Sequence, residues 1–186
     1  MFPSSDVWTV KNALIVYWSK TGNTEKVASA IEEGLQKAGV RVTVKRVEEA
    51  EGVDFFEYDL ICVGAPSYQW HTPEPMTRFL LNRFNYYRQQ GRVRPDSPRV
   101  GKKALIFCTY SGPHTGLNEA TPCGKYMGQF FEHLGIDVLD EWYVLGEFHG
   151  SLENSTKGQM GDIRGKPTPA ELRAVSEKAE KLAVMI

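Results

Sequence analysis

The chain has 186 residues and a formal net charge of −1, so it can form one domain and carries no overall field for nucleic acid or a membrane surface. Hydrophobic residues make up 41% of the chain and charged residues 24%, which is typical of a soluble globular protein. The start, MFPSSDVWTVKN, has no basic stretch and no long apolar core, so we expect neither a secretion signal nor a membrane-spanning segment.

Apolar runs alternate with amphipathic stretches and predict five strands separated by helices. The expected strands are 13–18, 40–46, 60–64, 104–109 and about 136–145. The expected helices are about 24–38, 73–87, 121–134 and a last one from residue 168. Thr72 before Pro73 is a candidate helix cap, and Thr168-Pro169-Ala170-Glu171 has the pattern of a capping box.

This order predicts a parallel sheet, because parallel neighbours need crossover connections. Strands 13–18, 60–64 and 104–109 are continuous apolar runs, as expected when both faces are covered, whereas 40–46 alternates with charges and suits an edge. We therefore predict an α/β fold, a doubly wound five-stranded parallel sheet of order 2-1-3-4-5 with helices on both faces. A ligand would bind beyond the carboxyl ends of the strands, at loops 19–24, 65–72, 110–120 and 146–168.

We expect residues 1–186 to form a single domain, with an N-terminal extension at 1–11 and a loop insertion at 146–168. The three cysteines are far apart and form no CxxC pair, so neither zinc nor an iron–sulfur cluster is indicated. Cys62 and Cys108 lie in apolar runs and are interpreted as core residues. A reducing, cytoplasmic location is the simplest expectation.

The most informative segment is ALIVYWSKTGNT, at residues 13–24. An apolar strand leads into a loop of small and hydroxyl residues that ends at a helix start, where free N–H groups and the helix dipole favour an anion. The patterns GxxxxGK[ST] and GxGxxG are both absent, which argues against an ATP-type phosphate loop or a dinucleotide loop. A simpler alternative is that Asn23 or Thr24 only caps the helix.

The loop resembles the phosphate-binding loop of flavodoxins, commonly [ST]-x-T-G-x-T, which wraps the phosphate of FMN. Ser19, Thr21, Gly22 and Thr24 match that pattern. The resemblance implies FMN as the cofactor and a flavodoxin-like fold. It implies a phosphate site made of Ser19, Lys20, Thr21, Gly22, Asn23 and Thr24.

Two further loops have aromatic residues with no evident structural need, as expected beside a planar cofactor. By position in the flavodoxin family, these loops would flank the flavin ring. The residues concerned are Pro66, Ser67, Tyr68, Gln69 and Trp70, then Thr109, Tyr110, Ser111 and Gly112. The resemblance covers roughly residues 12–145 and 168–186. Gly64-x-Pro66-Ser67 is also similar to the equivalent loop of flavodoxin-like NAD(P)H:quinone reductases.

The chain departs from the electron-carrier flavodoxins in its charge. Those proteins are usually strongly acidic, whereas this chain has a net charge of −1. Its loops 64–73 and 109–118 contain no acidic residue and two histidines, His71 and His114. We therefore expect the fully reduced, anionic flavin to form at a less negative potential. Gln69 and Trp70 stand where such proteins often have a glycine whose peptide flips on reduction, so no flip is expected here.

Two other segments are open to interpretation. Residues 78–103 hold eight bases and one acid, a net of +7, and we expect 88–103 to lie at the end of the sheet away from the flavin. A solvated basic loop is the simplest reading, and docking of an acidic protein or of a second copy of this chain is the alternative. The insertion 146–168 should emerge beside the flavin, where His149 and Arg164 could reach a substrate, although a self-packed loop is equally compatible.

The sequence therefore supports an FMN-binding redox protein that passes electrons to or from a protein partner, with no catalytic side chain and no metal. The alternative is an NAD(P)H-dependent FMN oxidoreductase of the quinone-reductase type. A binding module that has lost the flavin is a third possibility, against which the intact hydroxyl pattern of 19–24 argues. The expected partners are a redox protein or NAD(P)H and quinone, with no nucleic acid and a monomeric or homodimeric chain.

Overall fold

The structure is a computed structural model that describes residues 10–186. Most of the predicted N-terminal extension at 1–11, and with it the expectation about a secretion signal, lies outside the described residues. Within 10–186, no helix combines the length and the apolar character that crossing a bilayer would require.

The five predicted strands form one parallel sheet of order β2-β1-β3-β4-β5, which confirms the predicted topology. The strands are β1 (Asn12–Tyr17), β2 (Arg41–Arg46), β3 (Leu60–Pro66), β4 (Lys103–Tyr110) and β5 (Asp137–Leu145). The apolar strands β1, β3 and β4 are almost wholly buried, and the alternating strand β2 is a partly exposed edge, as expected. The other edge strand, β5, is also partly exposed.

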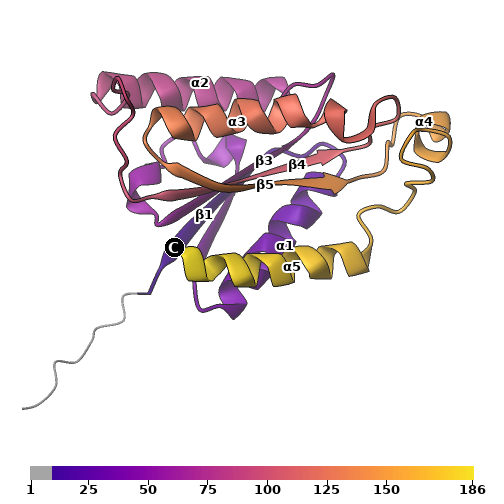
Figure 1. Cartoon of the computed structure of the whole chain (residues 1–186), viewed down its shortest axis with the longest axis horizontal. Helices are drawn as coiled ribbons and strands as arrows, with labels where there is room; N and C mark the ends of the chain where they lie inside the picture. Colours follow the sequence, from indigo (N-terminus) through magenta and orange to yellow (C-terminus); the bar gives the residue numbers. More distant parts are fainter. Residues whose placement is uncertain (1–9) are drawn as a thin grey trace, which may run out of the picture.

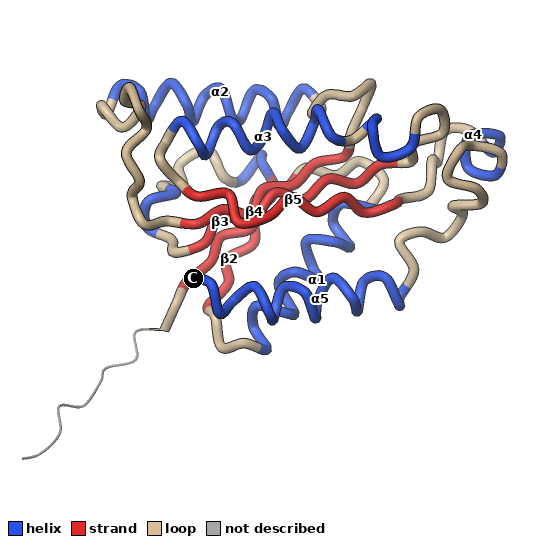
Figure 2. Tube along the Cα trace, viewed as in Figure 1, coloured by secondary structure: helices blue, strands red, loops and turns tan. Residues whose placement is uncertain are grey.

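Helices cover both faces of the sheet (Figures 1 and 2). They are α1 (Asn23–Lys37), α2 (Glu74–Gln89), α3 (Thr121–His133), α4 (Leu152–Thr156) and α5 (Pro169–Leu182). In Figure 1, α2 and α3 lie on one side of the sheet, and α1 and α5 on the other. The short α4 stands apart, near the carboxyl ends of the strands.

Each face of the sheet has its own hydrophobic core. Under α2 and α3 the core is rich in aromatic rings: Phe55 lies within 6.0 Å, centroid to centroid, of Phe79, Tyr87, Phe130 and Phe131. Under α1 and α5 the core is mainly aliphatic. The three cysteines are free and buried, in agreement with the interpretation of Cys62 and Cys108 as core residues.

Of the helix caps predicted at Thr72 and Thr168, only the one at Thr168 forms. The capping box at Thr168 is confirmed, because its side chain accepts from the Glu171 N–H while the Glu171 carboxylate accepts from the Thr168 N–H. The prediction that Thr72 caps α2 is wrong. Pro73 is the cap residue, without a side-chain hydrogen bond, and the Thr72 hydroxyl instead bonds the Thr77 hydroxyl at 2.6 Å.

The later part of the basic segment, residues 88–103, lies at the amino ends of the strands. Lys103 begins β4 and bonds the Asp137 carboxylate at 2.8 Å, and Arg99 contacts the same carboxylate at 3.3 Å. Arg92 stacks 4.0 Å above the Phe56 ring. These bases therefore lie at the opposite end of the sheet from the loops that follow the strands.

Candidate functional site

A cavity of ≈ 920 Å³ lies beyond the carboxyl ends of β1, β3, β4 and β5. This is the edge of the sheet at which ligands of such folds bind. Fourteen of the fifteen residues that the sequence predicts as cofactor-binding line the cavity: Ser19, Lys20, Thr21, Asn23, Thr24, Pro66, Ser67, Tyr68, Gln69, Trp70, Thr109, Tyr110, Ser111 and Gly112. Gly22 does not line it but is the cap residue of α1.

The first loop is closed by its own hydroxyl groups. The Ser19 hydroxyl accepts from the Gly22 N–H at 3.1 Å, and Gly22 has a left-handed φ of 95°, which a glycine adopts without strain. No side chain caps α1. The alternative that Asn23 or Thr24 serves only as a cap is therefore wrong.

Instead, both side chains reach across the cavity floor to other elements. The buried Thr24 hydroxyl bonds the Thr109 hydroxyl of β4 at 2.7 Å, and the Asn23 side-chain amide donates to the Glu147 carbonyl at 3.0 Å. In the hydroxyl pair only one hydrogen is used, so the accepting hydroxyl keeps its own hydrogen for a further acceptor. The Oδ1 atom of Asn23 is buried without a hydrogen-bond partner.

The start of α1 offers free donors to the cavity. Within the described part of the chain, the amide N–H groups of Thr21, Asn23, Thr24 and Glu25 donate to no other residue, and the first bond of the helix runs from Lys26 to Gly22. The free amides, the hydroxyls of Ser19, Thr21 and Thr24, and the positive end of the helix dipole suit a dianion. The loop therefore fits the phosphate of FMN by the chemistry of its donors.

The second loop makes a two-residue turn at the cavity rim. Tyr68 and His71 exchange backbone hydrogen bonds of 2.9 and 3.0 Å, and the residues between them, Gln69 and Trp70, have φ values of 48° and 68°. Two neighbouring non-glycine residues with left-handed φ are uncommon and cost conformational energy. Tyr68 is 42% exposed and Trp70 58% exposed, so the turn presents aromatic surface.

The third loop is held by a carboxylate and by close backbone packing. One Glu119 oxygen accepts the N–H groups of His114 and Thr115, both at 2.7 Å. Gly112 is in the left-handed region, and an added Cβ would meet the Gly116 carbonyl oxygen at 2.7 Å. Burial raises the pKa of Tyr110. The loop thus presents a neutral phenol and a fixed backbone to the cavity.

The insertion 146–168 forms a further wall and is more ordered than the sequence suggested. The Ser155 hydroxyl of α4 accepts from the Phe148 N–H at 3.1 Å and donates to the Phe148 carbonyl at 2.9 Å. The Gln159 N–H donates to the Pro113 carbonyl, which ties the insertion to the third loop. Gly146, Glu147, Phe148, His149, Gly150 and Asn154 all line the cavity.

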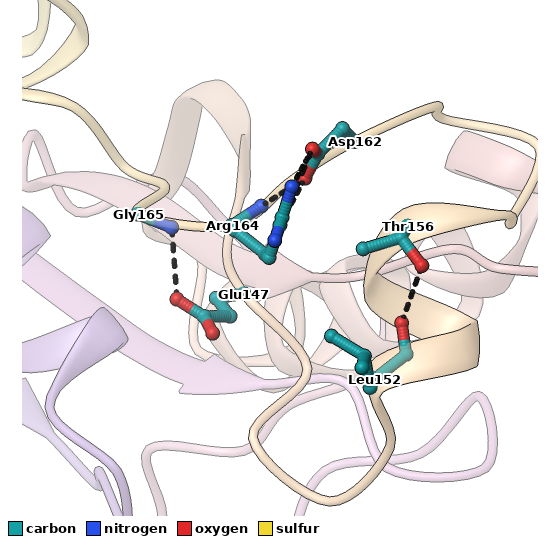
Figure 3. Close-up of polar contacts among 6 residues, drawn as sticks. All are labelled: Glu147, Leu152, Thr156, Asp162, Arg164 and Gly165. Atoms are coloured by element: carbon teal, nitrogen blue, oxygen red, sulfur yellow. Dashed lines mark hydrogen bonds and ion pairs between the residues drawn. The ribbon is translucent and has the colours of Figure 1, made fainter.

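Figure 3 shows how the far part of the insertion is held. The Glu147 carboxylate accepts the Gly165 N–H at 2.8 Å, and the Arg164 guanidinium pairs with the Asp162 carboxylate at 2.6 Å. Arg164 does not line the cavity, so of the two basic residues considered for substrate contact only His149 is in place.

Two carboxylates line the cavity that sequence reasoning did not identify, Glu119 and Glu147. Glu119 lies one residue beyond the acid-free segment 109–118, and Glu147 lies two residues beyond the end of β5. Their positions in loops that follow strands were the available signal. His114 lines the cavity, whereas His71 lies outside it in a neighbouring one.

Comparisons with known proteins agree with this geometry. A family model described as a flavodoxin domain matches residues 14–138. A protein of Rhizobium rhizogenes named NAD(P)H dehydrogenase (quinone) is 32% identical, over 91% of this chain and 94% of that protein. One of the same name from Archaeoglobus fulgidus is 26% identical, over 91% and 97%.

Among solved structures, a flavodoxin from the domain Archaea superposes with a TM-score of 0.64 at 21% identity, over 94% of this chain and 97% of that one. That likeness supports the fold, and the family model reaches from β1 into β5. The chain therefore belongs to the family of flavodoxin domains, a family that binds FMN.

Proposed function

We propose that this chain is an FMN-dependent oxidoreductase that takes electrons from NAD(P)H and passes them to a quinone. The observation that carries this proposal is the likeness to NAD(P)H dehydrogenases (quinone), which extends over more than nine-tenths of both partners. The overall reaction would be NAD(P)H + H⁺ + quinone → NAD(P)⁺ + quinol. Bound FMN would supply reversible acceptance of two electrons between the two substrates.

In this proposal the first loop binds the phosphate of the cofactor. The hydroxyls of Ser19, Thr21 and Thr24 and the free amides at the start of α1 donate hydrogen bonds to it. Gly22 fits the tight turn that brings these amides together. Lys20 adds a positive charge at the same cavity.

The second and third loops would hold the ring between them. Tyr68 and Trp70 on one side and Tyr110 on the other supply flat apolar surface, and the backbone of 109–112 supplies polar groups at its edge. His114 and His149 lie at the cavity, where an imidazole can give up the proton that quinone reduction consumes.

A second candidate is electron transfer to a protein partner, with no soluble substrate. The observation that favours it is an exposed aromatic rim around the cavity, where Tyr68, Trp70 and Phe148 are 42%, 58% and 39% exposed. Exposed apolar surface at a redox site is suited to covering by another protein.

Anaerobic mixing of the FMN-loaded protein with NADPH or NADH separates the two candidates. We expect the visible absorbance of the flavin to bleach and then to recover when a quinone such as menadione is added, with steady turnover. If NAD(P)H leaves the colour unchanged while a chemical reductant bleaches it, the oxidoreductase proposal fails and the electron carrier is favoured.

The cofactor site has its own test. Thr21→Val should weaken FMN binding roughly 10-fold or more, because a hydroxyl bonded to a charged group contributes about 1.5–3 kcal/mol. The matched control is Thr156→Val, since Thr156 lies outside the cavity and its hydroxyl bonds only the Leu152 carbonyl at 2.7 Å (Figure 3). Equal FMN affinities of the two variants would contradict the assignment of the loop.

A further inference from the structure

A second cavity, of ≈ 830 Å³, lies on the other side of the turn at residues 68–71. It opens between the end of β1 and the start of α2, and residues that line only this cavity are Trp18, His71, Thr72, Pro73, Glu74 and Pro75. Its volume falls in the range of pockets that bind small molecules, about 300–1,000 Å³. The proposed FMN site is the first cavity, which leaves the second cavity without a role.

Three aromatic side chains form its walls. Trp18 and Tyr68 meet edge to face, with ring centroids 5.8 Å apart and an interplanar angle of 89°, so they make a corner. Trp70, which is well exposed, lines the same cavity. Trp18 is partly buried, and together the three side chains offer aromatic surface to a planar ligand.

The charges in this cavity favour an anion. Lys20 is exposed and takes part in none of the ion pairs found within residues 10–186. The one carboxylate in the lining, Glu74, is paired with Arg78 at 3.0 Å. The start of α2 also faces this region without a side-chain cap, which adds the positive end of a helix dipole.

The two cavities are adjacent. Lys20, Tyr68, Gln69 and Trp70 line both of them, so the turn is a shared wall and a ligand in the second cavity would lie next to one in the first. Trp18 and His71 belong to the second cavity alone. Neither is itself proposed to hold FMN, although Trp18 packs against Tyr68, which is.

We propose that the second cavity is a binding site for a flat aromatic ring that carries a negative charge, and that the second redox substrate docks there beside the flavin. The inference rests on the proposed function for the identity of that substrate but not for the binding itself. Two substrates share this chemistry: the adenosine phosphate portion of NAD(P)H, and an anionic quinone. Trp18 stacks on the ring, and Lys20 and His71 face its negative group.

The test measures binding rather than turnover. The FMN-loaded protein is labelled with 5-fluorotryptophan, and its fluorine NMR signals are assigned with Trp18→Phe and Trp70→Phe variants. ADP and 1,2-naphthoquinone-4-sulfonate are then added separately. We expect at least one of them to shift the Trp18 and Trp70 signals in a saturable way, while the signal of buried Trp142 stays unchanged.

The two arms identify the substrate. A shift with ADP, together with competition against NAD(P)H, assigns the cavity to the electron donor, and a shift with the sulfonate assigns it to the acceptor. If neither probe shifts the Trp18 signal at millimolar concentration, the inference is overturned. If a probe binds but NAD(P)H and quinone give no turnover, the proposed function fails and the site stands.

Variants locate the binding energy. Trp18→Leu should weaken the bound probe up to about 10-fold, because an aromatic pair contributes about 0.5–1.5 kcal/mol beyond area burial. His71→Gln should weaken it less and serves as a second variant if Trp18→Leu folds poorly. FMN affinity should be unchanged in His71→Gln, since His71 lines only the second cavity. The matched control is Tyr126→Leu, since Tyr126 is an exposed aromatic residue on α3 that lines neither cavity.

Discussion

The hydroxyl pair of Thr24 and Thr109 joins the start of α1 to the end of β4 beneath the proposed phosphate site. The two oxygens are 2.7 Å apart, and both residues are at least 98% buried, so little solvent reaches either hydroxyl. A buried hydroxyl that loses its partner costs its desolvation energy, whereas removal of both partners costs much less. The pair should therefore behave as a unit.

We expect Thr24→Val and Thr109→Val each to lower the free energy of unfolding of the FMN-free protein by about 1–3 kcal/mol, because each leaves one buried hydroxyl unpaired. The double variant should be more stable than the sum of the two losses predicts. Urea unfolding of the four proteins gives the coupling energy directly. Strictly additive losses would show that the two hydroxyls do not depend on each other.

The start of α5 joins the insertion to the last helix through one carboxylate. Burial alone would raise the pKa of Glu171, but an ion pair with Lys166 and hydrogen bonds from the Thr168 N–H and hydroxyl outweigh it and lower the pKa. A carboxylate with a lowered pKa in the folded state stabilises the protein at a pH above its usual pKa. That stabilisation is lost as the pH falls through the lowered value.

Glu171→Gln should therefore be less stable than the parent near neutral pH, by up to about 1 kcal/mol, since the side chain is partly exposed and solvent weakens the ion pair. The difference should shrink to nothing as the pH falls below the usual carboxyl range, because the parent then carries a neutral side chain as well. Thermal unfolding from about pH 7 to pH 3 measures this. Glu177→Gln, an exposed change on the same helix, should show no such convergence.

The cap of α5 was predicted correctly from the sequence, whereas the cap of α2 was not. Thr168 and Glu171 cap each other through residues three apart, so the sequence contains the whole interaction. Thr72 is a cap-type residue next to Pro73, but its hydroxyl bonds the hydroxyl of Thr77 in α2 instead. The residue type tells us which groups a hydroxyl can bond, but the conformation of the surrounding backbone determines which of them is within reach.

At the scale of the molecule, the charge around the cavity comes from segments distant in sequence. The loops 64–73 and 109–118 are free of acids, from which we expected a less negative potential for the anionic reduced flavin. The folded chain adds Glu119 and Glu147 to the cavity lining. A carboxylate disfavours a nearby negative charge, so these residues oppose part of the expected effect.

Glu147→Gln keeps the side chain's shape and its acceptor for the Gly165 N–H but removes the charge. We expect the reduction potential of bound FMN to rise by roughly tens of millivolts, with a larger effect at low ionic strength. Redox titration of the FMN-loaded protein measures the change. Glu153→Gln is the matched control, since Glu153 is an exposed acid of α4 that lines neither cavity. A similar shift in the control would point to overall charge instead of proximity.

The sequence by itself determined the sheet, its strand order and the edge at which the larger cavity lies. Those features follow from patterns within single segments: continuous apolar runs in β1, β3 and β4, alternation in β2, and a hydroxyl loop between a strand and a helix. Periodicity reports burial along one element, and connection rules convert the order of elements into topology. Fourteen of the fifteen predicted cofactor residues lie at one cavity for the same reason, because all of them lie at or shortly after the carboxyl ends of parallel strands.

Only the tertiary structure decided which side chains meet at that edge. Thr24 bonds a residue 85 positions away, and Asn23 bonds one 124 positions away. The carboxylates of the lining, and the second cavity between Trp18 and His71, also depend on how separate loops pack. Local sequence patterns do not specify such contacts, because the conformational preferences of a residue do not determine its distance from a loop that follows another strand. The loop at 19–24 and its location at the cavity could therefore be predicted from the sequence, whereas the charges and the second aromatic corner beside it depend on the tertiary structure.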